Sequence, residues 1–226
     1  MESKSKQTNS VFEEQASQVH LHFPKLRGEK SNDGVLIVKG EVDIIDRDGT
    51  YWESFQVEIH PVDEFPFRYP SVYETGGKIP RIGDWHVYEN TQTCCIDVEP
   101  EEIIKCRDGL SLVDFIRREM IPYFFAQTFR RKEGYYPNGE YEHNELGLFQ
   151  YYDRLLKTNG DPRSTVHQMM VMLRTPRPAR THDCFCRSQE KFRRCHRDAY
   201  DTIHKIGQRM VLYHAQQIAD MFKKNA

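Results

Sequence analysis

Four metal-binding residue types lie within thirteen residues near the C-terminal end of the sequence, and they constrain that region more than any other feature. They are Cys184, Cys186, Cys195 and His196, in the pattern C-x-C-x8-C-H. Zinc prefers a tetrahedral set of thiolate and imidazole ligands, and these side chains supply one complete set. We therefore predict a structural Zn²⁺ site that is closed to water. The alternative, a chance scatter of reduced cysteines, fits this spacing poorly.

The composition indicates a folded protein of one or two domains. The 226 residues are 38% hydrophobic and 29% charged, with a net charge of -2, so we expect neither a nucleic-acid binder nor a membrane-surface binder. The sequence contains no apolar run long enough to cross a bilayer, and its N-terminus lacks a signal-peptide core. We expect a cytoplasmic protein. In that compartment thiols stay reduced, so the cysteines indicate chemistry and metal binding before disulfides.

Hydrophobic patterns predict an α+β fold. Residues rich in β-branched side chains, flanking an Asp48-Gly49 turn, predict strands at 35–45, 51–59 and 72–74. Apolar residues at helical spacing predict helices at 11–23, 142–156, 165–174 and 199–222, and one that begins after Asp108 or Ser111 and is broken or kinked by Pro122. Residues 1–9 are expected to be frayed. Because the strands come in a run and do not alternate with helices, the sheet is expected to be antiparallel.

A second cysteine pair lies in the stretch HVYENTQTCCIDVEP, residues 86–100, which shows no clear periodicity. A thiolate is both a good nucleophile and a good leaving group, so either Cys94 or Cys95 is a candidate for covalent catalysis. The C-terminal cluster already has four ligands of its own, which leaves these two cysteines outside the predicted metal site. The sixth cysteine, Cys106, is interpreted as a bystander.

Residues 1–165 resemble a ubiquitin-conjugating (UBC-like) domain in layout and in three motifs. The run 65–70, FPFRYP, resembles the family's Tyr/Phe-Pro-x-x-x-Pro turn, and His86 stands where the family has the histidine of its His-Pro-Asn triplet. The run 95–98, CIDV, resembles the Cys-Leu-Asp-Ile run that begins with the nucleophile. The resemblance implies an N-terminal helix, a four-stranded antiparallel meander and C-terminal helices. It also implies that Cys95, and not Cys94, carries a thioester.

The same loop departs from the family pattern. Val87 and Tyr88 replace the proline and the asparagine, and in the family that asparagine is credited with stabilising the oxyanion formed during amine attack. Asn90, Tyr88 and Thr93 are the nearby residues that are able to replace it. His86 is interpreted as ordering the loop or as lowering the thiol pKa. Two roles for Asp97 are equally open. It either orients an incoming amine or accepts hydrogen bonds from backbone N–H groups of the loop.

Residues 184–196 resemble the SEC-C motif, C-P-C-G-S-G-x-K-Y-x-x-C-H, a small zinc module appended to many bacterial proteins. Seven positions match, with Phe192 for the usual tyrosine, whereas Phe185, Arg187 and Gln189 replace Pro, Gly and Gly. The resemblance implies a structural zinc module with a docking role. Its basic surface is either a solvated face or a docking site for an acidic partner. We therefore expect a UBC-like domain at 1–165, a helix and linker at 166–180, and a zinc module with a terminal helix at 181–226.

Together these features resemble the divergent bacterial conjugating proteins of CBASS antiphage operons (type II short). The resemblance implies an acyltransferase that forms a Cys95 thioester with the C-terminus of a cGAS/DncV-like nucleotidyltransferase and transfers it to an amine. The chain has no ATP-binding glycine loop, so a separate activating enzyme or a preactivated partner is required. The first alternative is a noncatalytic UBC-like binding module. Two further alternatives are a nucleic-acid-binding zinc protein and a papain-like hydrolase that would use His143 or His167.

Overall fold

A computed structural model describes residues 2–137, 141–142 and 144–224. The chain forms two compact units, and each is described by itself. The first consists of Met1–Asp97 and Lys105–Glu140, and the second of Val98–Ile104 and Tyr141–Ala226. The expected division at residue 165 differs from this grouping, because the helices expected at 142–156 and 165–174 both fall in the second unit with the Cys/His cluster.

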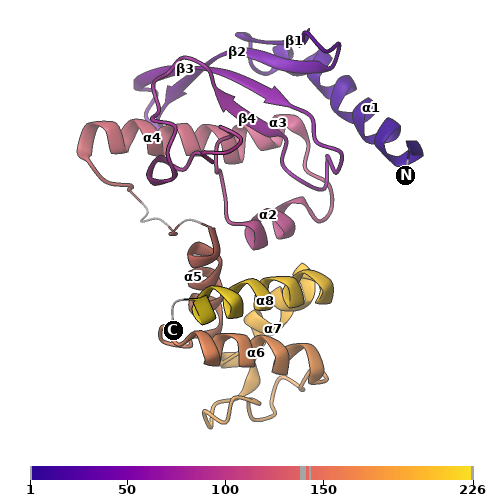
Figure 1. Ribbon diagram of the computed structural model, residues 1–226, viewed down its shortest axis with the longest axis vertical. Coiled ribbons are helices and arrows are strands. Elements are labelled where there is room, and N and C mark those ends of the chain that lie inside the picture. Colours follow the sequence, from indigo (N-terminus) through magenta and orange to yellow (C-terminus); the bar gives the residue numbers. More distant parts are fainter. Residues whose placement is uncertain (1, 138–140, 143, 225–226) are drawn as a thin grey trace. The chain divides into compact units, whose positions relative to one another are not determined.

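The first unit contains a four-stranded antiparallel sheet in the order β1-β2-β3-β4, which confirms the predicted α+β class (Figure 1). The strands are β1 (Leu26–Lys30), β2 (Leu36–Ile45), β3 (Tyr51–His60) and β4 (Ser71–Glu74). Strand β3 alternates as predicted, with Phe55, Val57 and Ile59 buried. Strand β1 is not among the strands that the hydrophobic patterns predicted. Its side chains after Leu26 are mostly exposed, so it carries little of the apolar signal that marks a strand.

Gly40 permits the close approach of β2 to the start of β1. It has φ 145°, and a Cβ atom at this position would lie 2.1 Å from the carbonyl oxygen of Lys25. No other residue type lacks a Cβ, so glycine is required where these two backbones meet.

Helices pack against the sheet of the first unit. Helix α1 (Glu2–Gln18) continues into a 3-10 turn (Val19–Leu21), so the expected start at residue 11 was wrong. Ser111, one of the two predicted starts, caps α3 (Leu112–Phe115) by accepting a hydrogen bond from the Asp114 N–H. Helix α3 leads through a π-helical segment (Ile116–Met120) into α4 (Ile121–Glu133). The wider π turn accommodates Pro122, which lacks an N–H and crowds the preceding turn.

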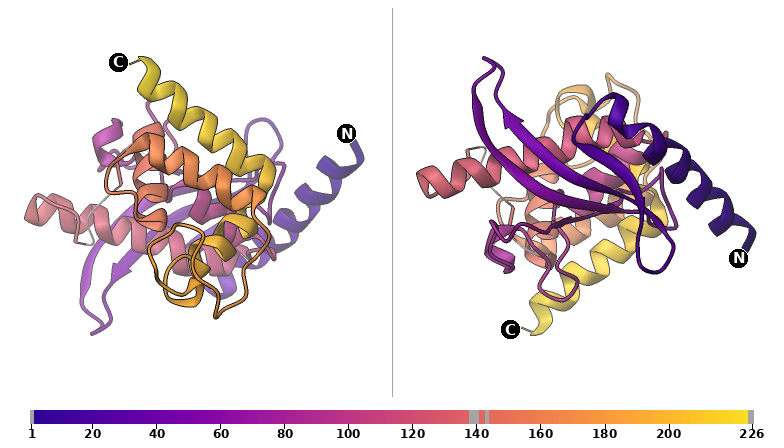
Figure 2. Two further views of the ribbon diagram at one scale, coloured as in Figure 1. Left: turned by 90° about the horizontal axis from the view of Figure 1, so that it is seen from below. Right: turned by 90° about the horizontal axis from the view of Figure 1, so that it is seen from above.

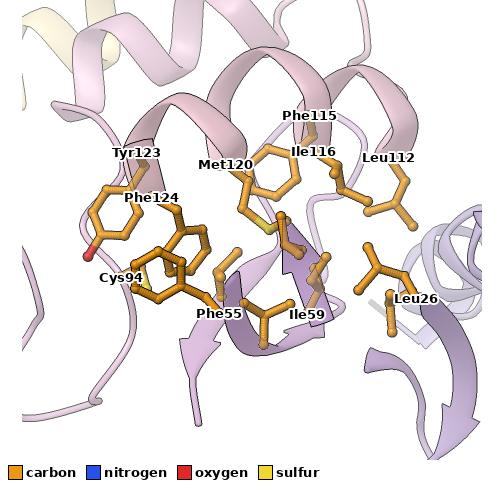
Figure 3. Close-up of a cluster of buried hydrophobic side chains, with 14 of the residues drawn as sticks. Leu26, Phe55, Ile59, Cys94, Leu112, Phe115, Ile116, Met120, Tyr123 and Phe124 are labelled. Atoms are coloured by element: carbon orange, nitrogen blue, oxygen red, sulfur yellow. The ribbon is translucent and has the colours of Figure 1, made fainter. Parts of the chain in front are cut away.

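The segment from α3 through the π turn to α4 forms one long helix along the sheet (Figure 2). The core of the first unit lies between this helix and the sheet (Figure 3). Phe55 of β3 stacks on Phe124 of α4 with ring centroids 4.7 Å apart, and the Phe12 ring of α1 meets Phe65 edge-on at 5.4 Å. Cys94 belongs to the same buried cluster, beside Tyr123 and Phe124 (Figure 3). The stretch that carries the two cysteines is therefore anchored in the core by its first cysteine.

The second unit is helical in its described part. It contains α5 (Asn144–Leu156), α6 (Pro162–Arg174), α7 (Arg197–Ile206), α8 (Gln208–Lys224), a 3-10 turn (Phe192–Arg194) and residues 99–104 of α2 (Glu99–Cys106). The single helix expected at 199–222 is two helices, because Gly207 has φ 94° and ends α7. Helix α2 was not predicted from the sequence.

The helices of the second unit share one buried cluster that includes Tyr152, Leu156, Phe192 and Ile203. The loop that carries the metal-ligand pattern therefore packs on a helical core through Cys184 and Phe192. No helix in the described part of the chain combines the length and the apolar character needed to cross a membrane.

Candidate functional site

The four predicted metal ligands lie together in the second unit. One ligand atom from each of Cys184, Cys186, Cys195 and His196 lies within 4.8 Å of all the others. The Cys184 Sγ and the Cys195 Sγ lie 3.4 and 3.1 Å from His196 Nδ1, and the Cys186 and Cys195 sulfurs are 3.5 Å apart. Separations of this size place four donors around one point. The cluster can hold a metal ion, and three thiolates with one imidazole are the donor set of a closed tetrahedral site.

The turn between the ligands depends on residues that take left-handed backbone conformations. Arg187 and Gln189 have φ 62° and 64°, and they occupy the two positions where the SEC-C pattern has glycine. The chain then reverses through a bridge between Asp183 and Lys191, and the Cys184 N–H donates to the carbonyl of Glu190. Both residues therefore take a backbone conformation that favours glycine, at the cost of some strain.

A second contact orients the histidine ligand. His196 Nε2 lies 3.1 Å from the carbonyl oxygen of Leu156, the last residue of α5. A carbonyl only accepts, so Nε2 carries the proton and the bare Nδ1 faces the three sulfurs. Metal-binding histidines are commonly fixed in this way by an outer hydrogen bond. Because Leu156 lies 40 positions away, no local sequence signal could have identified it.

Hydrogen bonding lowers the pKa of one thiol of the cluster, which favours the thiolate form that binds metal. Although burial opposes it, hydrogen bonds from Ser188 lower the pKa of the Cys186 thiol to about 6. Burial raises the pKa of the neighbouring Cys184 thiol to about 12. A bound cation favours the thiolate form of both.

The second group of predicted residues lies in the first unit, on a hairpin-like loop after β4. Val87 and Cys94 form an antiparallel bridge, and the Cys95 N–H donates to the His86 carbonyl at 2.7 Å. The Cys94 N–H donates to the Val72 carbonyl of β4 at 2.8 Å. The backbone around both cysteines is therefore fixed to the sheet.

The two cysteines have different environments. Cys94 is 8% exposed and its side chain lies in the core, whereas Cys95 is partly exposed. Adjacent residues of an extended segment point to opposite sides, so burial of one directs the other outward. Burial raises the pKa of the Cys94 thiol to about 12, which keeps it protonated at neutral pH. Of the pair, Cys95 is the thiol with part of its surface exposed.

The His86 side chain packs beside an aromatic ring. Its imidazole lies edge-on to Tyr136 with centroids 4.8 Å apart, and its backbone has φ 50°. The His86 carbonyl accepts hydrogen bonds from the Cys95 N–H and from the Tyr123 hydroxyl, at 2.7 and 2.9 Å. These contacts favour the loop-ordering interpretation of His86, which acts on Cys95 through the backbone.

Asp97 lies in an ion-pair network of the first unit. Lys105 Nζ lies 2.6 Å from Asp97 and 2.8 Å from Glu119, and the Tyr69 hydroxyl donates to Asp97 at 3.4 Å. Although burial opposes it, the two carboxylates raise the pKa of Lys105, so its ammonium stays charged. Lys105 is thus a partner that neither interpretation of Asp97 included.

The predicted replacements for the missing asparagine lie toward the tip of the loop. Asn90 is exposed in the turn between Tyr88 and Thr93. The Tyr88 N–H closes this turn by donating a hydrogen bond to the Thr93 carbonyl at 2.9 Å. The Val87–Cys94 bridge lies between this turn and Cys95. Asn90 lies five positions before Cys95 in the sequence, on the turn side of this bridge.

One polar cluster was missed from the sequence. His214 of α8 is fully buried, with Nδ1 2.8 Å from the Tyr152 hydroxyl and Nε2 3.2 Å from Glu99. Glu99 lies only four positions after Cys95, but its partner is 115 positions away. Of the two histidines considered for a papain-like arrangement, His143 lies outside the described residues and His167 is exposed on α6.

Comparisons of the chain with models of protein families, with curated proteins and with solved structures find no match.

Proposed function

We propose that the protein is a bacterial ubiquitin-conjugating-like acyltransferase that carries a protein C-terminus as a thioester on Cys95. The observation that carries the proposal is the contrast within the cysteine pair, with Cys94 buried in the core and Cys95 partly exposed beside it. The order of elements also supports the proposal, because a four-stranded antiparallel meander is followed by the cysteine loop and then by a long helix, as in the layout expected for a UBC-like domain. The donor is the C-terminus of a cGAS/DncV-like nucleotidyltransferase, in antiviral defence.

The chemistry requires two acyl transfers. The Cys95 thiolate attacks an activated carbonyl, a new C–S bond forms, and the activating group leaves with the electron pair of the broken bond. An acceptor amine then attacks the Cys95 thioester, the C–S bond breaks, and the amine proton passes to water. Asn90, Tyr88 and Thr93 are the candidate donors to the oxyanion.

The Cys/His cluster of the second unit is proposed to hold Zn²⁺. Three cysteines and one histidine match the soft tetrahedral donor set that zinc prefers over harder divalent cations. The four ligands leave no open position, so the ion acts structurally and supplies no step of the acyl transfer.

A noncatalytic binding module is the second candidate. The observation that favours it is the position of Asn90 at the loop tip together with Val87 and Tyr88 in place of the family's Pro-Asn pair. A protein of this kind would bind the nucleotidyltransferase C-terminus without forming a covalent bond.

A synthetic peptide thioester separates the two candidates without an activating enzyme. The peptide carries the C-terminal residues of the nucleotidyltransferase as a small-molecule thioester, and intact-mass spectrometry follows its transfer to the protein. We expect one adduct per chain that is released by excess thiol and absent in Cys95→Ala. Cys95→Ser should form an ester that resists thiol.

Cys94→Ala is the matched control because it removes the neighbouring thiol only. It should retain the adduct in full. Loss of the adduct in Cys94→Ala alone would assign the nucleophile to Cys94, and absence of any adduct in the wild type would favour the binding module.

A further inference from the structure

One face of helix α4 contacts three consecutive backbone carbonyls that lead into the cysteine loop. Tyr123, Gln127 and Arg130 are spaced four and three positions apart, which places them on the same side of the helix. Their side chains donate, in that order, to the carbonyl oxygens of residues 86, 85 and 84. The Tyr123 and Gln127 bonds are 2.9 and 3.0 Å long. Every residue in this set belongs to the first unit.

The core of the first unit fixes the direction in which this face points. The π turn Ile116–Met120 ends three residues before Tyr123. Because a π turn holds one residue more than an α turn, it rotates the side chains that follow by about 100°. Phe124 then stacks on Phe55 of the sheet, and the buried Tyr123 ring lies beside Cys94 (Figure 3). A well-packed helix therefore presents the Tyr123 hydroxyl to the loop.

The His86 carbonyl is the point where α4 meets the backbone of the exposed cysteine. It accepts hydrogen bonds from the Cys95 N–H at 2.7 Å and from the Tyr123 hydroxyl at 2.9 Å. A carbonyl oxygen has two lone pairs, so both bonds form at once. His86 has φ 50°, a left-handed conformation that a residue other than glycine keeps only where its surroundings hold it. The Tyr123 bond is one of the contacts that hold it.

The Tyr123 hydroxyl stays a donor throughout the range in which a thiol ionises. Burial raises its pKa well above the ordinary value for tyrosine, so it keeps its proton. A neutral hydroxyl bonded to a backbone carbonyl adds no charge to the loop. Its effect on Cys95 is therefore exerted through the placement of the backbone.

We infer that Tyr123 is a positioning residue for Cys95, and that Gln127 and Arg130 extend the same hold back along the chain to residues 85 and 84. Three bonds from one helix face fix the start of the loop, and the bond between the His86 carbonyl and the Cys95 N–H transmits this placement to the thiol. The value of this placement rests on the proposed function, in which Cys95 carries the thioester. The placement itself is measurable without any acyl donor.

The test measures how fast iodoacetamide alkylates Cys95 in the full-length protein as a function of pH, with the site localised by tandem mass spectrometry. Tyr123→Phe removes one hydroxyl and keeps the buried ring, and the His86 carbonyl keeps its bond from Cys95, so the fold should persist. We expect the limiting rate at high pH to rise about fivefold, the factor that corresponds to loss of one hydrogen bond. Exchange of the Cys95 N–H, followed by NMR, should accelerate by a similar factor. The midpoint of the pH profile should not move, because the hydroxyl carries no charge.

Thr128→Val is the matched control, because it also removes one buried hydroxyl from α4. That hydroxyl donates to the Phe124 carbonyl at 3.0 Å and to Glu53 of β3 at 3.4 Å, away from the cysteine loop. This variant should alkylate at Cys95 as fast as the wild type. Cys106, which is fully buried in the first unit, reports unfolding in the same experiment. It should stay as protected in Tyr123→Phe as in the wild type.

An unchanged Cys95 rate in Tyr123→Phe would overturn the inference. An equal increase in Thr128→Val, or a parallel increase at Cys106, would also overturn it, because the effect would then be a loss of stability. A shifted midpoint would do so as well, since it would mean that the hydroxyl acts on the charge of the thiol. Absence of a peptide-thioester adduct in the wild type, while these rates change as expected, would overturn the proposed function alone.

Discussion

The raised pKa of Cys94 makes the stability of the first unit depend on pH in a way that one substitution can isolate. Burial raises the pKa of this thiol to about 12, whereas a thiol in an unfolded chain titrates near ~8.5. The folded state therefore holds the proton more tightly than the unfolded state. The resulting stability is fully present below ~8.5 and is lost as the pH rises toward the folded pKa.

The size of the effect follows from the two pKa values. One pKa unit corresponds to ~1.36 kcal/mol, so between about pH 7.5 and about pH 10 the unfolded thiol ionises while the folded thiol does not. The free energy of unfolding should fall by about 2 kcal/mol from this group alone over that interval. Cys94→Ala lacks the group, so the difference in stability between wild type and variant should shrink by that amount.

Tryptophan fluorescence in urea is the appropriate assay. The chain has two tryptophans, Trp52 and Trp85, and both lie in the first unit, so the signal reports that unit. A phosphine reductant prevents thiol oxidation. Val87→Ala is the matched control, because Val87 is buried opposite Cys94 in the same bridge and carries no titrating group. A Cys94→Ala cost that is constant with pH would refute the burial argument, as would an equal pH dependence in Val87→Ala.

Two further predictions concern the ion pairs and the metal. Lys105→Met should destabilise the first unit by about 1–2 kcal/mol at neutral pH, because two shielded carboxylates lose their partner; fluorescence unfolding measures this. Since the Lys105 pKa is raised, the loss should persist to about pH 10 and diminish only above it, and a variant as stable as wild type would contradict the network. Cys186→Ala should abolish a 1:1 zinc content measured by elemental mass spectrometry, whereas His182→Ala, an exposed neighbour outside the cluster, should retain it. Zinc retained in Cys186→Ala would place the site elsewhere.

The predictions that agree with the structure are those that depend on neighbouring residues. The ligand spacing in 184–196 is local, and the four donors do lie together. Alternation in 51–59 and the Ser111 cap are likewise local signals, and both are present. The errors also have local causes. Strand β1 exposes most of its side chains, and the division of the final helix depends on Gly207, a residue whose left-handed conformation is visible only in the structure.

The sequence by itself determined the metal-ligand set, the α+β class and the choice of the cysteine pair as a candidate reactive site. Only the tertiary structure decided the environments within that pair, because burial of Cys94 depends on Phe124 and Tyr123 of a distant helix. The contacts of Lys105 with Asp97 and Glu119, of His196 with Leu156, and of His214 with Glu99 were also invisible beforehand. Each joins groups whose partners are set by packing, and packing places side chains together irrespective of their separation along the chain.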